Sequence, residues 1–183
     1  MKQQANAELF DFVHNPELDQ VSKYYLAMTD LEKEKSEEAV FFWSFLRTSG
    51  LRVHHQFFED FNFHDGFQIV NEQGQLVYFS SNISLKLRHD LDTVVRTPFD
   101  ELFERDPFMS KRIMDGFIQL LTGPKTQSYD LSSVPRHVVR QKGFPDHDYT
   151  VQFIKAYPVH RKDGHFYGFV LRLNVQEGSS LGH

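Results

Sequence analysis

The spacing of apolar and polar positions separates the chain into a helical first third and a later part that alternates like a sheet. From Asp65 to Asn82, short apolar stretches stand on both sides of a polar turn that contains Gly74. Side chains with a period of two point to opposite faces of a strand, and glycine supplies the positive φ angle that such a turn needs. We therefore predict a β-hairpin over this stretch.

One amphipathic helix and two long strands are predicted further along the chain. Asp106-Pro107 begins a segment whose apolar residues fall at helical spacing, and Gly123-Pro124 ends it. Residues 149–159 and 166–175 are predicted as long strands, joined by a turn at residues 161–164.

The segment from Ser132 to His147 is longer than a simple hairpin needs. It carries a basic patch of three residues, Arg136, Arg140 and Lys142. Long loops often hold functional residues. The segment could be a lid over a cavity, a contact for a partner, or a solvated insertion.

Within residues 1–60, apolar residues recur at the spacing of helices. Asn15-Pro16 is a typical helix start, and Thr29 to Glu32 has the spacing of a capping box. The run from Ala39 to Leu46 predicts a helix, and a last helix could carry four apolar residues: Val53, Phe57, Phe58 and Phe61. The apolar faces of these helices either pack on the rest of the chain as a satellite bundle or form an interface with a second chain.

Residues 65–82 resemble the start of a PAS domain, in which an Asp-Gly pair precedes two short apolar strands and a turn with glycine. Thr97 to Phe103 resembles the start of the family's middle helix, although Arg96-Thr97 stands where a Gly-Lys pair is usual. Residues 149–175 resemble the last two strands of the family. The strength of the resemblance lies in the order of elements: two strands, short helices, one long helix and three strands.

The resemblance implies an α+β fold, with a PAS-like antiparallel five-stranded sheet that has helices on one face and follows a helical N-terminal extension. We expect the extension in residues 1–60, for dimerisation or partner docking, and the sensor domain in residues 61–176. Residues 177–183 are expected to be the remnant of an expression tag, so that an output domain lies outside this chain.

Net charge and hydropathy argue against a nucleic-acid partner and against a membrane or secreted location. The net charge of −5 and the pI near 6.0 argue against direct nucleic-acid contact, which needs clustered Lys and Arg. The longest apolar run, Ala39 to Leu46, is too short to span a membrane, and the start lacks the layout of a signal peptide. We expect a cytoplasmic location.

The chain has no cysteine. This excludes disulfides, thiolate metal sites and a cysteine nucleophile. Within the PAS family it also excludes a covalently bound flavin or any other chromophore linked through cysteine.

The sequence contains only weak signals for a catalytic or metal site. No Gly-x-Ser-x-Gly elbow, Walker loop, dinucleotide fingerprint or HExxH helix occurs, so we expect no enzymatic activity. His55 with Glu59, and the run 146–148, lack further metal ligands at a recognisable spacing. PAS haem sensors usually place their axial histidine on the long middle helix, which has no histidine here; haem is disfavoured, although His89 and His137 lie just outside that helix.

The resemblance places a ligand cavity between the inner face of the sheet and the middle helices. The candidate lining residues are Phe67, Ile69, Tyr78, Phe99, Phe103, Phe117, Phe153, Lys155, Tyr157, Phe169 and Leu171. Core packing alone would also explain most of them, because they are large and aromatic. Strand alternation puts Phe153, Lys155 and Tyr157 on one face, and which face is inside stays open. Four polar groups could orient a small aromatic or acidic ligand: Tyr78, Lys155, Tyr157 and Arg172.

The expected function is a PAS sensor module that binds a small organic ligand and relays the signal through a homodimer to an output domain. The whole protein would then be a bacterial transcription regulator or signalling enzyme. The alternative is a ligand-free PAS module for protein–protein interaction. A weaker alternative is a haem or metal redox sensor that uses His89, His137 or His147.

Overall fold

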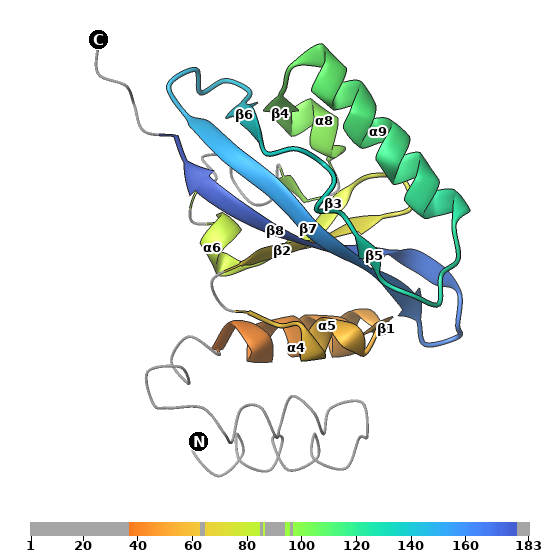
Figure 1. The fold of residues 1–183 in the computed structure, drawn as a ribbon. Coiled ribbons are helices and arrows are strands. Elements are labelled where there is room, and N and C mark those ends of the chain that lie inside the picture. Colours follow the sequence, from red (N-terminus) through yellow and green to blue (C-terminus); the bar gives the residue numbers. More distant parts are fainter. Residues whose placement is uncertain (1–36, 63–64, 85, 87–93, 96, 179–183) are drawn as a thin grey trace, which may run out of the picture.

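The structure is a computed structural model that describes residues 37–62, 65–84, 86, 94–95 and 97–178. This part of the chain is an α+β fold built on one antiparallel sheet (Figure 1). The strands are β1 (Leu51–Val53), β2 (Gly66–Asn71), β3 (Leu76–Phe79), β4 (Phe103–Glu104), β5 (Tyr129–Asp130), β6 (His137–Gln141), β7 (Asp148–Arg161) and β8 (Phe166–Glu177). The helices are α4 (Glu37–Ser49), α5 (Gln56–Glu59), α6 (Ser81–Ser84), α8 (Phe99–Leu102) and α9 (Pro107–Thr122).

The sheet runs in the order β3-β2-β8-β7-β6-β4, and the short strands β1 and β5 both pair with β7. Five of these strands, from β3 to β6 in that order, correspond to the predicted five-stranded sheet. Three strands of two or three residues, β1, β4 and β5, extend it. The predicted fold class is therefore confirmed.

The β2–β3 hairpin forms as predicted, because Asn71 and Gly74 build its turn. Gly74 has a φ of 76°. The side-chain oxygen of Asn71 accepts hydrogen bonds from the backbone N–H groups of Gln73 and Gln75, at 3.0 and 2.9 Å. Asparagine often holds a turn in this way. Local sequence alone is sufficient for this element.

The two predicted long strands are confirmed as β7 and β8, which lie at the centre of the sheet. β8 also pairs with β2, and Gly168 stands opposite Asn71. A Cβ atom on Gly168 would lie 2.1 Å from the carbonyl oxygen of Val70. Only glycine therefore permits this close approach of two backbones.

Helix α9 begins and ends where the sequence predicts. The Asp106 side chain caps its first turn, accepting hydrogen bonds from two backbone N–H groups at 3.0 and 3.2 Å. At the other end, the Lys125 ammonium donates to the carbonyl oxygens of Leu120, Leu121 and Gly123, at 2.6, 2.6 and 2.7 Å. These contacts satisfy carbonyl groups that have no partner inside the helix.

The long segment from Ser132 to His147 contains strand β6. β6 pairs with β7 in the register His137 opposite Val151, and its other edge pairs with β4. Its burial alternates between enclosed and exposed residues, as in a strand with one face in the core. The segment therefore contributes a strand to the sheet. This strand is the third closing strand that the PAS resemblance implied.

The part of the chain before β2 is partly as predicted. α4 confirms the helix expected from Ala39 to Leu46. The last expected helix is wrong in its extent, because Val53 lies in strand β1 opposite Val159, and α5 covers only Gln56–Glu59. The helix starts expected at Asn15 and Thr29 lie outside the described residues, and the division of the chain at residue 60 stays a prediction.

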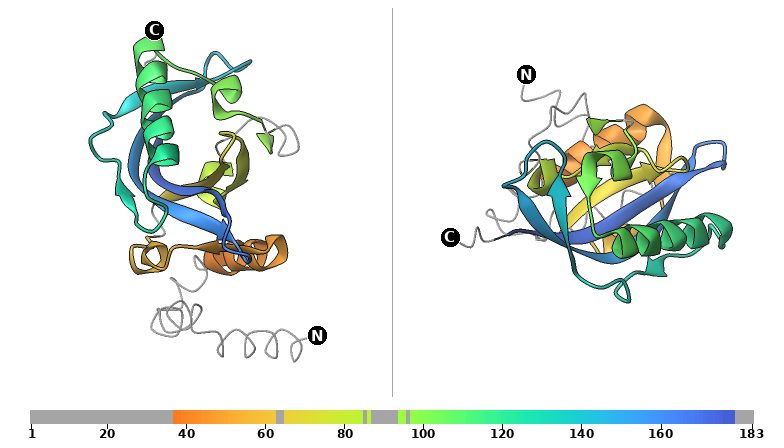
Figure 2. Two further views of the ribbon diagram at one scale, coloured as in Figure 1. Left: turned by 90° about the vertical axis from the view of Figure 1, so that its right-hand side faces the viewer. Right: turned by 90° about the horizontal axis from the view of Figure 1, so that it is seen from above.

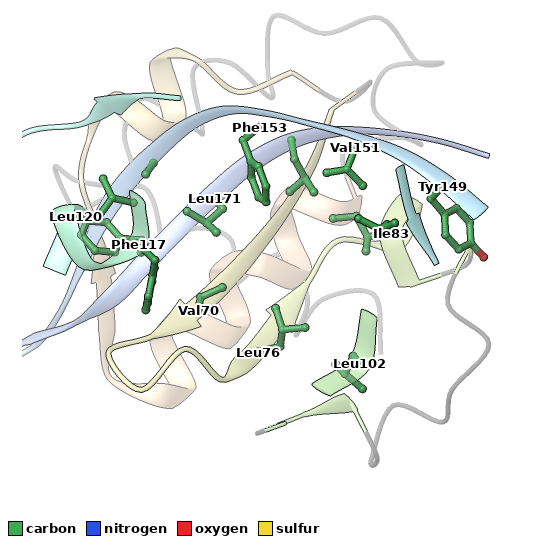
Figure 3. Close-up of a cluster of buried hydrophobic side chains, with 14 of the residues drawn as sticks. Val70, Leu76, Ile83, Leu102, Phe117, Leu120, Tyr149, Val151, Phe153 and Leu171 are labelled. Atoms are coloured by element: carbon green, nitrogen blue, oxygen red, sulfur yellow. The ribbon is translucent and has the colours of Figure 1, made fainter. Parts of the chain in front are cut away.

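The sheet separates two apolar clusters. α9 and α8 cover one face, which we call the inner face, and α4 and α5 lie on the other, the outer face (Figures 1 and 2). On the inner face, Phe117 and Leu120 of α9 reach towards Leu171 and Val70 of the sheet (Figure 3). On the outer face, the buried residues are Phe42, Leu46, Leu51, Phe57, Phe67, Ile69, Tyr157, Val159 and Val170.

Candidate functional site

Two adjoining cavities lie between the inner face of the sheet and the elements α8, β4 and α9. The volume that the centre of a water-sized sphere can occupy is ≈ 50 Å³ in the first and ≈ 60 Å³ in the second. They adjoin because four residues line both: Gln68, Phe99, Arg105 and Phe153. Small-molecule sites are usually such concave, largely apolar spaces with a few polar groups.

The two cavities differ in the elements that close them. The first lies beside β6 and the ends of β7 and β8, and its further lining residues are Ile83, Lys86, Phe103, Val139, Tyr149, Val151, Leu173 and Val175. The second lies under α9, and its further lining residues are Arg112, Ile113, Gly116, Phe117, Leu120, Leu131, Val134 and Leu171. Most of these side chains are apolar in both.

Arg105 stands at the junction of the two cavities, where the chain on both sides fixes its backbone. Just before it, β4 pairs with β6, and just after it, Asp106 caps helix α9. The centre of the guanidinium lies 5.5 Å from the ring centroid of Phe99 and 5.6 Å from that of Phe103. Cations at such distances are attracted to aromatic ring faces.

The Arg105 side chain is partly exposed, but its Nε atom is enclosed and has no hydrogen-bond partner within the described part of the chain. Burial lowers the pKa of Arg105 to about 10, against an opposing effect of the Asp100 carboxylate. The group therefore stays a cation at neutral pH. A guanidinium can only donate hydrogen bonds, so the enclosed N–H lacks an acceptor.

The charged residues that the structure describes in the lining of the cavities are all basic. Lys86 lines the first cavity, Arg112 lines the second, and Arg105 lines both. No Asp or Glu occurs among the described lining residues of either cavity. The chain as a whole has a net charge of −5, so this local excess of positive charge is opposite to the overall balance.

His137 is a second enclosed polar group beside the site. Its ring stacks on Phe153 with centroids 5.9 Å apart, and its Nδ1 lies 3.0 Å from the carbonyl oxygen of Pro135. Because a carbonyl can only accept, Nδ1 carries the proton in that contact and leaves Nε2 as an acceptor in the neutral ring. Burial lowers the pKa of His137, and the Arg105 charge lowers it further.

Six of the eleven predicted site residues lie on the inner face. Five of them line the cavities: Phe99, Phe103, Phe117, Phe153 and Leu171. Phe169 is fully buried in the same cluster but lines neither cavity. A ligand-binding role for these residues stays a prediction.

The other five predicted residues do not join them. Four apolar or aromatic residues pack on the outer face: Phe67, Ile69, Tyr78 and Tyr157. Lys155 also points to that side, where its ammonium contacts Asp60. The predicted set is thus split between two faces of one sheet.

The split has a backbone cause. The register of β7 against β8 shifts between Phe153 and Lys155, so that one extra residue, Ile154, is inserted. Such a β-bulge moves the following side chains to the opposite face. The alternation that placed Phe153 with Lys155 and Tyr157 is therefore wrong. A second shift inserts Val77 into β3, where Ile69 pairs with Tyr78 and Val70 with Leu76, so that Leu76 lies on the inner face and Tyr78 on the outer face.

The outer face carries a polar network. Asp60 Oδ2 accepts hydrogen bonds from the Lys155 ammonium at 2.6 Å and from the Tyr157 hydroxyl at 2.9 Å. Arg172 donates from Nε to Asp65 at 2.7 Å and from Nη1 to the Asp60 carbonyl oxygen at 2.9 Å. Three of the four polar groups that were expected to orient a ligand therefore hold the segment before β2 on the sheet. These groups are Lys155, Tyr157 and Arg172.

Several cavity residues were missed from the sequence: Gln68, Lys86, Arg105 and Arg112. Arg105 had the clearest local signal, since it directly precedes the Asp-Pro cap of the predicted helix. The other three carry no signal that separates them from solvent-exposed polar residues.

Within the described part of the chain, no group of three or more His, Cys, Asp or Glu could hold a metal ion. His89 lies outside the described residues. Among the helices that the structure describes, none is long and apolar enough to cross a membrane.

Comparison with known proteins gave no matching family model and no matching curated protein. Solved structures include a PAS domain of a protein from Colwellia psychrerythraea, with 10% sequence identity and a TM-score of 0.45, over 63% of this chain and 87% of that one. They also include the E. coli DhaR(N)–DhaL complex, with 17% identity and a TM-score of 0.35, over 61% of this chain and 31% of that one.

The fold of this chain is PAS-like. Its elements follow the order that the sequence resemblance implied: the hairpin β2–β3, the short helices α6 and α8, the long helix α9, and the strands β6, β7 and β8. The cavities lie where that resemblance places a ligand, between the sheet and the helices that follow the hairpin.

Proposed function

We propose that this chain is a cytoplasmic PAS sensor module that binds a small molecule in the inner-face cavities. The observation that supports it is the pair of adjoining apolar cavities around one enclosed guanidinium, that of Arg105. A packed core without a ligand would leave a buried donor unsatisfied, which is unfavourable. The proposed role is binding, without catalysis.

A signal could pass through the sheet itself, because β7 and β8 contribute to both faces. Phe153 lines the cavities, and two residues later Lys155 holds Asp60 on the outer face. On β8, Leu171 lines the second cavity and its neighbour Arg172 holds Asp65. A ligand that favours one arrangement of these strands would shift the population of outer-face contacts.

We propose that the relay ends in a homodimer and an output domain outside this chain. Helix α4 supports the dimer, because Phe41 is 66% exposed and Val40 is 44% exposed on a helix that otherwise packs against the sheet. Exposed apolar side chains that lie together commonly mark an interface.

A second candidate function is a protein-interaction module. Helix α9 supports it, since Phe108 is 72% exposed and Ile118 is 52% exposed on its outward side. In that case the partner would bind α9 and the cavities would have no ligand.

Native mass spectrometry of the purified protein, together with its absorption spectrum, tests the proposal. A retained small molecule that disappears in the variant Gly116→Leu would support a sensor, because a Cβ on Gly116 meets open space at the edge of the second cavity. Gly116→Ala is the matched control, since it leaves most of that space open. A Soret band would indicate haem.

The proposal fails if the protein carries bare polypeptide mass after gentle purification and no added small molecule stabilises it. The interaction module would then be favoured, and Phe108→Glu would be the variant to test for loss of a partner.

A further inference from the structure

We propose that the ligand of this site is a small organic acid with an apolar body, whose carboxylate is bound by Arg105 and whose body occupies the second cavity. This inference deepens the proposed function and rests on it.

The first argument is the unsatisfied donor. Arg105 presents an enclosed Nε–H that no group in the described part of the chain accepts. The rings of Phe99 and Phe103 flank the guanidinium without supplying an acceptor. A carboxylate has two acceptor oxygens whose geometry matches the guanidinium fork. It would satisfy this donor better than a neutral amide or hydroxyl, which offers a weaker acceptor.

The second argument is the sign of the charge around the site. The charged side chains that line the cavities are Lys86, Arg105 and Arg112, and no carboxylate lies among the described lining residues. Arg112 is partly engaged, because its Nη2 donates to the backbone oxygen of Ser133 at 3.2 Å. A cationic ligand would be repelled by all three residues. An anionic ligand would be attracted, and a low-dielectric surrounding strengthens that attraction.

The third argument is the shape and chemistry of the second cavity. Apart from its two arginines and Gln68, it is lined by apolar side chains and by Gly116. Gly116 adds room on the α9 side, where nothing lies within 4 Å of the position of a Cβ atom. The cavity therefore suits a compact aromatic or short aliphatic group. The polar end of the molecule then meets Arg105, at the junction with the first cavity.

The test compares carboxylic acids with their neutral amides on the full 183-residue chain. Suitable probe pairs are benzoate with benzamide, phenylacetate with phenylacetamide, and hexanoate with hexanamide. Each pair keeps the apolar body and removes only the charge. Binding is measured by isothermal titration calorimetry and by the shift in melting temperature. We expect at least one acid to bind at least tenfold more tightly than its amide.

Two substitutions locate the contact. Arg105→Gln keeps a long polar side chain and should weaken binding of that acid at least tenfold, bringing it close to the amide. Arg112→Gln is the matched control from the same cavity and should change binding less. Gly116→Leu should abolish binding of both members of the pair. The melting temperature of each variant without a probe checks that it is folded.

The outcomes separate this inference from the proposed function. Equal binding of an acid and its amide, both abolished by Gly116→Leu, would overturn the anionic ligand and keep the sensor. Acid binding that survives Arg105→Gln would overturn the role of Arg105. If no probe binds and no retained molecule is found by mass spectrometry, both the inference and the proposed function fail.

Discussion

Phe153 and Lys155 are two residues apart on strand β7, yet their side chains lie on opposite faces of the sheet. Phe153 lines both inner cavities, whereas the Lys155 ammonium lies 2.6 Å from Asp60 Oδ2 on the outer face. The inserted residue Ile154 causes this change, because the register with β8 passes from Phe153 opposite Leu173 to Lys155 opposite Arg172. The bulge thus connects the cavity directly with the polar network that holds the segment before β2.

Replacing Asp60 should destabilise the protein. Its side chain and that of Lys155 are 26% and 23% exposed, so Asp60→Asn would leave a largely enclosed ammonium without its counter-ion. We expect a loss of about 1–2 kcal/mol in the free energy of unfolding at pH 7, measured by chemical denaturation. The control is Asp148→Asn, which removes a more exposed pair with Arg140 and should cost about 0.5 kcal/mol or less.

The effect of Asp60→Asn should also depend on pH. Burial raises the pKa of Asp60, but hydrogen bonds from Lys155 and Tyr157 outweigh it, and the pKa lies below its usual value. A lowered pKa contributes stability above the usual value of about 4, and that stability is lost as the pH falls through the lowered value. The difference between the natural protein and the variant should therefore shrink below about pH 4. A constant difference would show that the carboxylate charge is unimportant.

Mild acid should destabilise the ligand-free protein through His137. Burial lowers the pKa of His137 below its usual value of 6.5, as it does for His54 and His160. The unfolded chain then binds more protons than the folded one, so stability is present above about pH 6.5 and falls as the pH decreases below it. Chemical denaturation at pH 7.5 and pH 5.5 measures this change. His137→Gln should make the free energy of unfolding depend less on pH. An unchanged dependence would assign the effect to His54 and His160 instead.

Two glycines should respond to alanine in opposite directions. Gly168→Ala places a Cβ atom 2.1 Å from the Val70 carbonyl oxygen, so β2 and β8 must move apart. We expect a loss of about 2–3 kcal/mol or more in the free energy of unfolding. Gly116→Ala places a methyl group in open space within helix α9 and should add about 0.5–1 kcal/mol. Equal effects at the two positions would contradict the close approach of β2 and β8.

Helix α4 should be part of the dimer interface. Phe41 is 66% exposed, and Phe41→Glu would place a charge in that interface. We expect the variant to be a monomer by size-exclusion chromatography with light scattering, at a concentration where the natural protein is a dimer. Phe108→Glu on α9 removes an equally exposed ring and should leave the dimer intact. Dissociation by Phe108→Glu alone would instead place the interface on α9.

Local elements could be predicted because short segments contain their own determinants. The turn of the β2–β3 hairpin is built by Asn71 and Gly74, which are three residues apart, and helix α9 is set by Asp106-Pro107 and Gly123. The order of these elements was sufficient to predict the PAS-like sheet. β6 was missed because Pro135, Gly143 and Pro145 surround a strand of only five residues.

The sequence by itself determined the hairpin β2–β3, helix α9 and the long strands β7 and β8, because caps, turns and periodicity act over a few residues. Only the tertiary structure decided which side chains share the cavity. A β-bulge depends on pairing with a strand distant in the chain, and one inserted residue reverses every side chain that follows it. For the same reason Arg105, whose neighbours Gln68 and Phe153 come from distant strands, could be recognised only once the sheet and helix α9 had enclosed it.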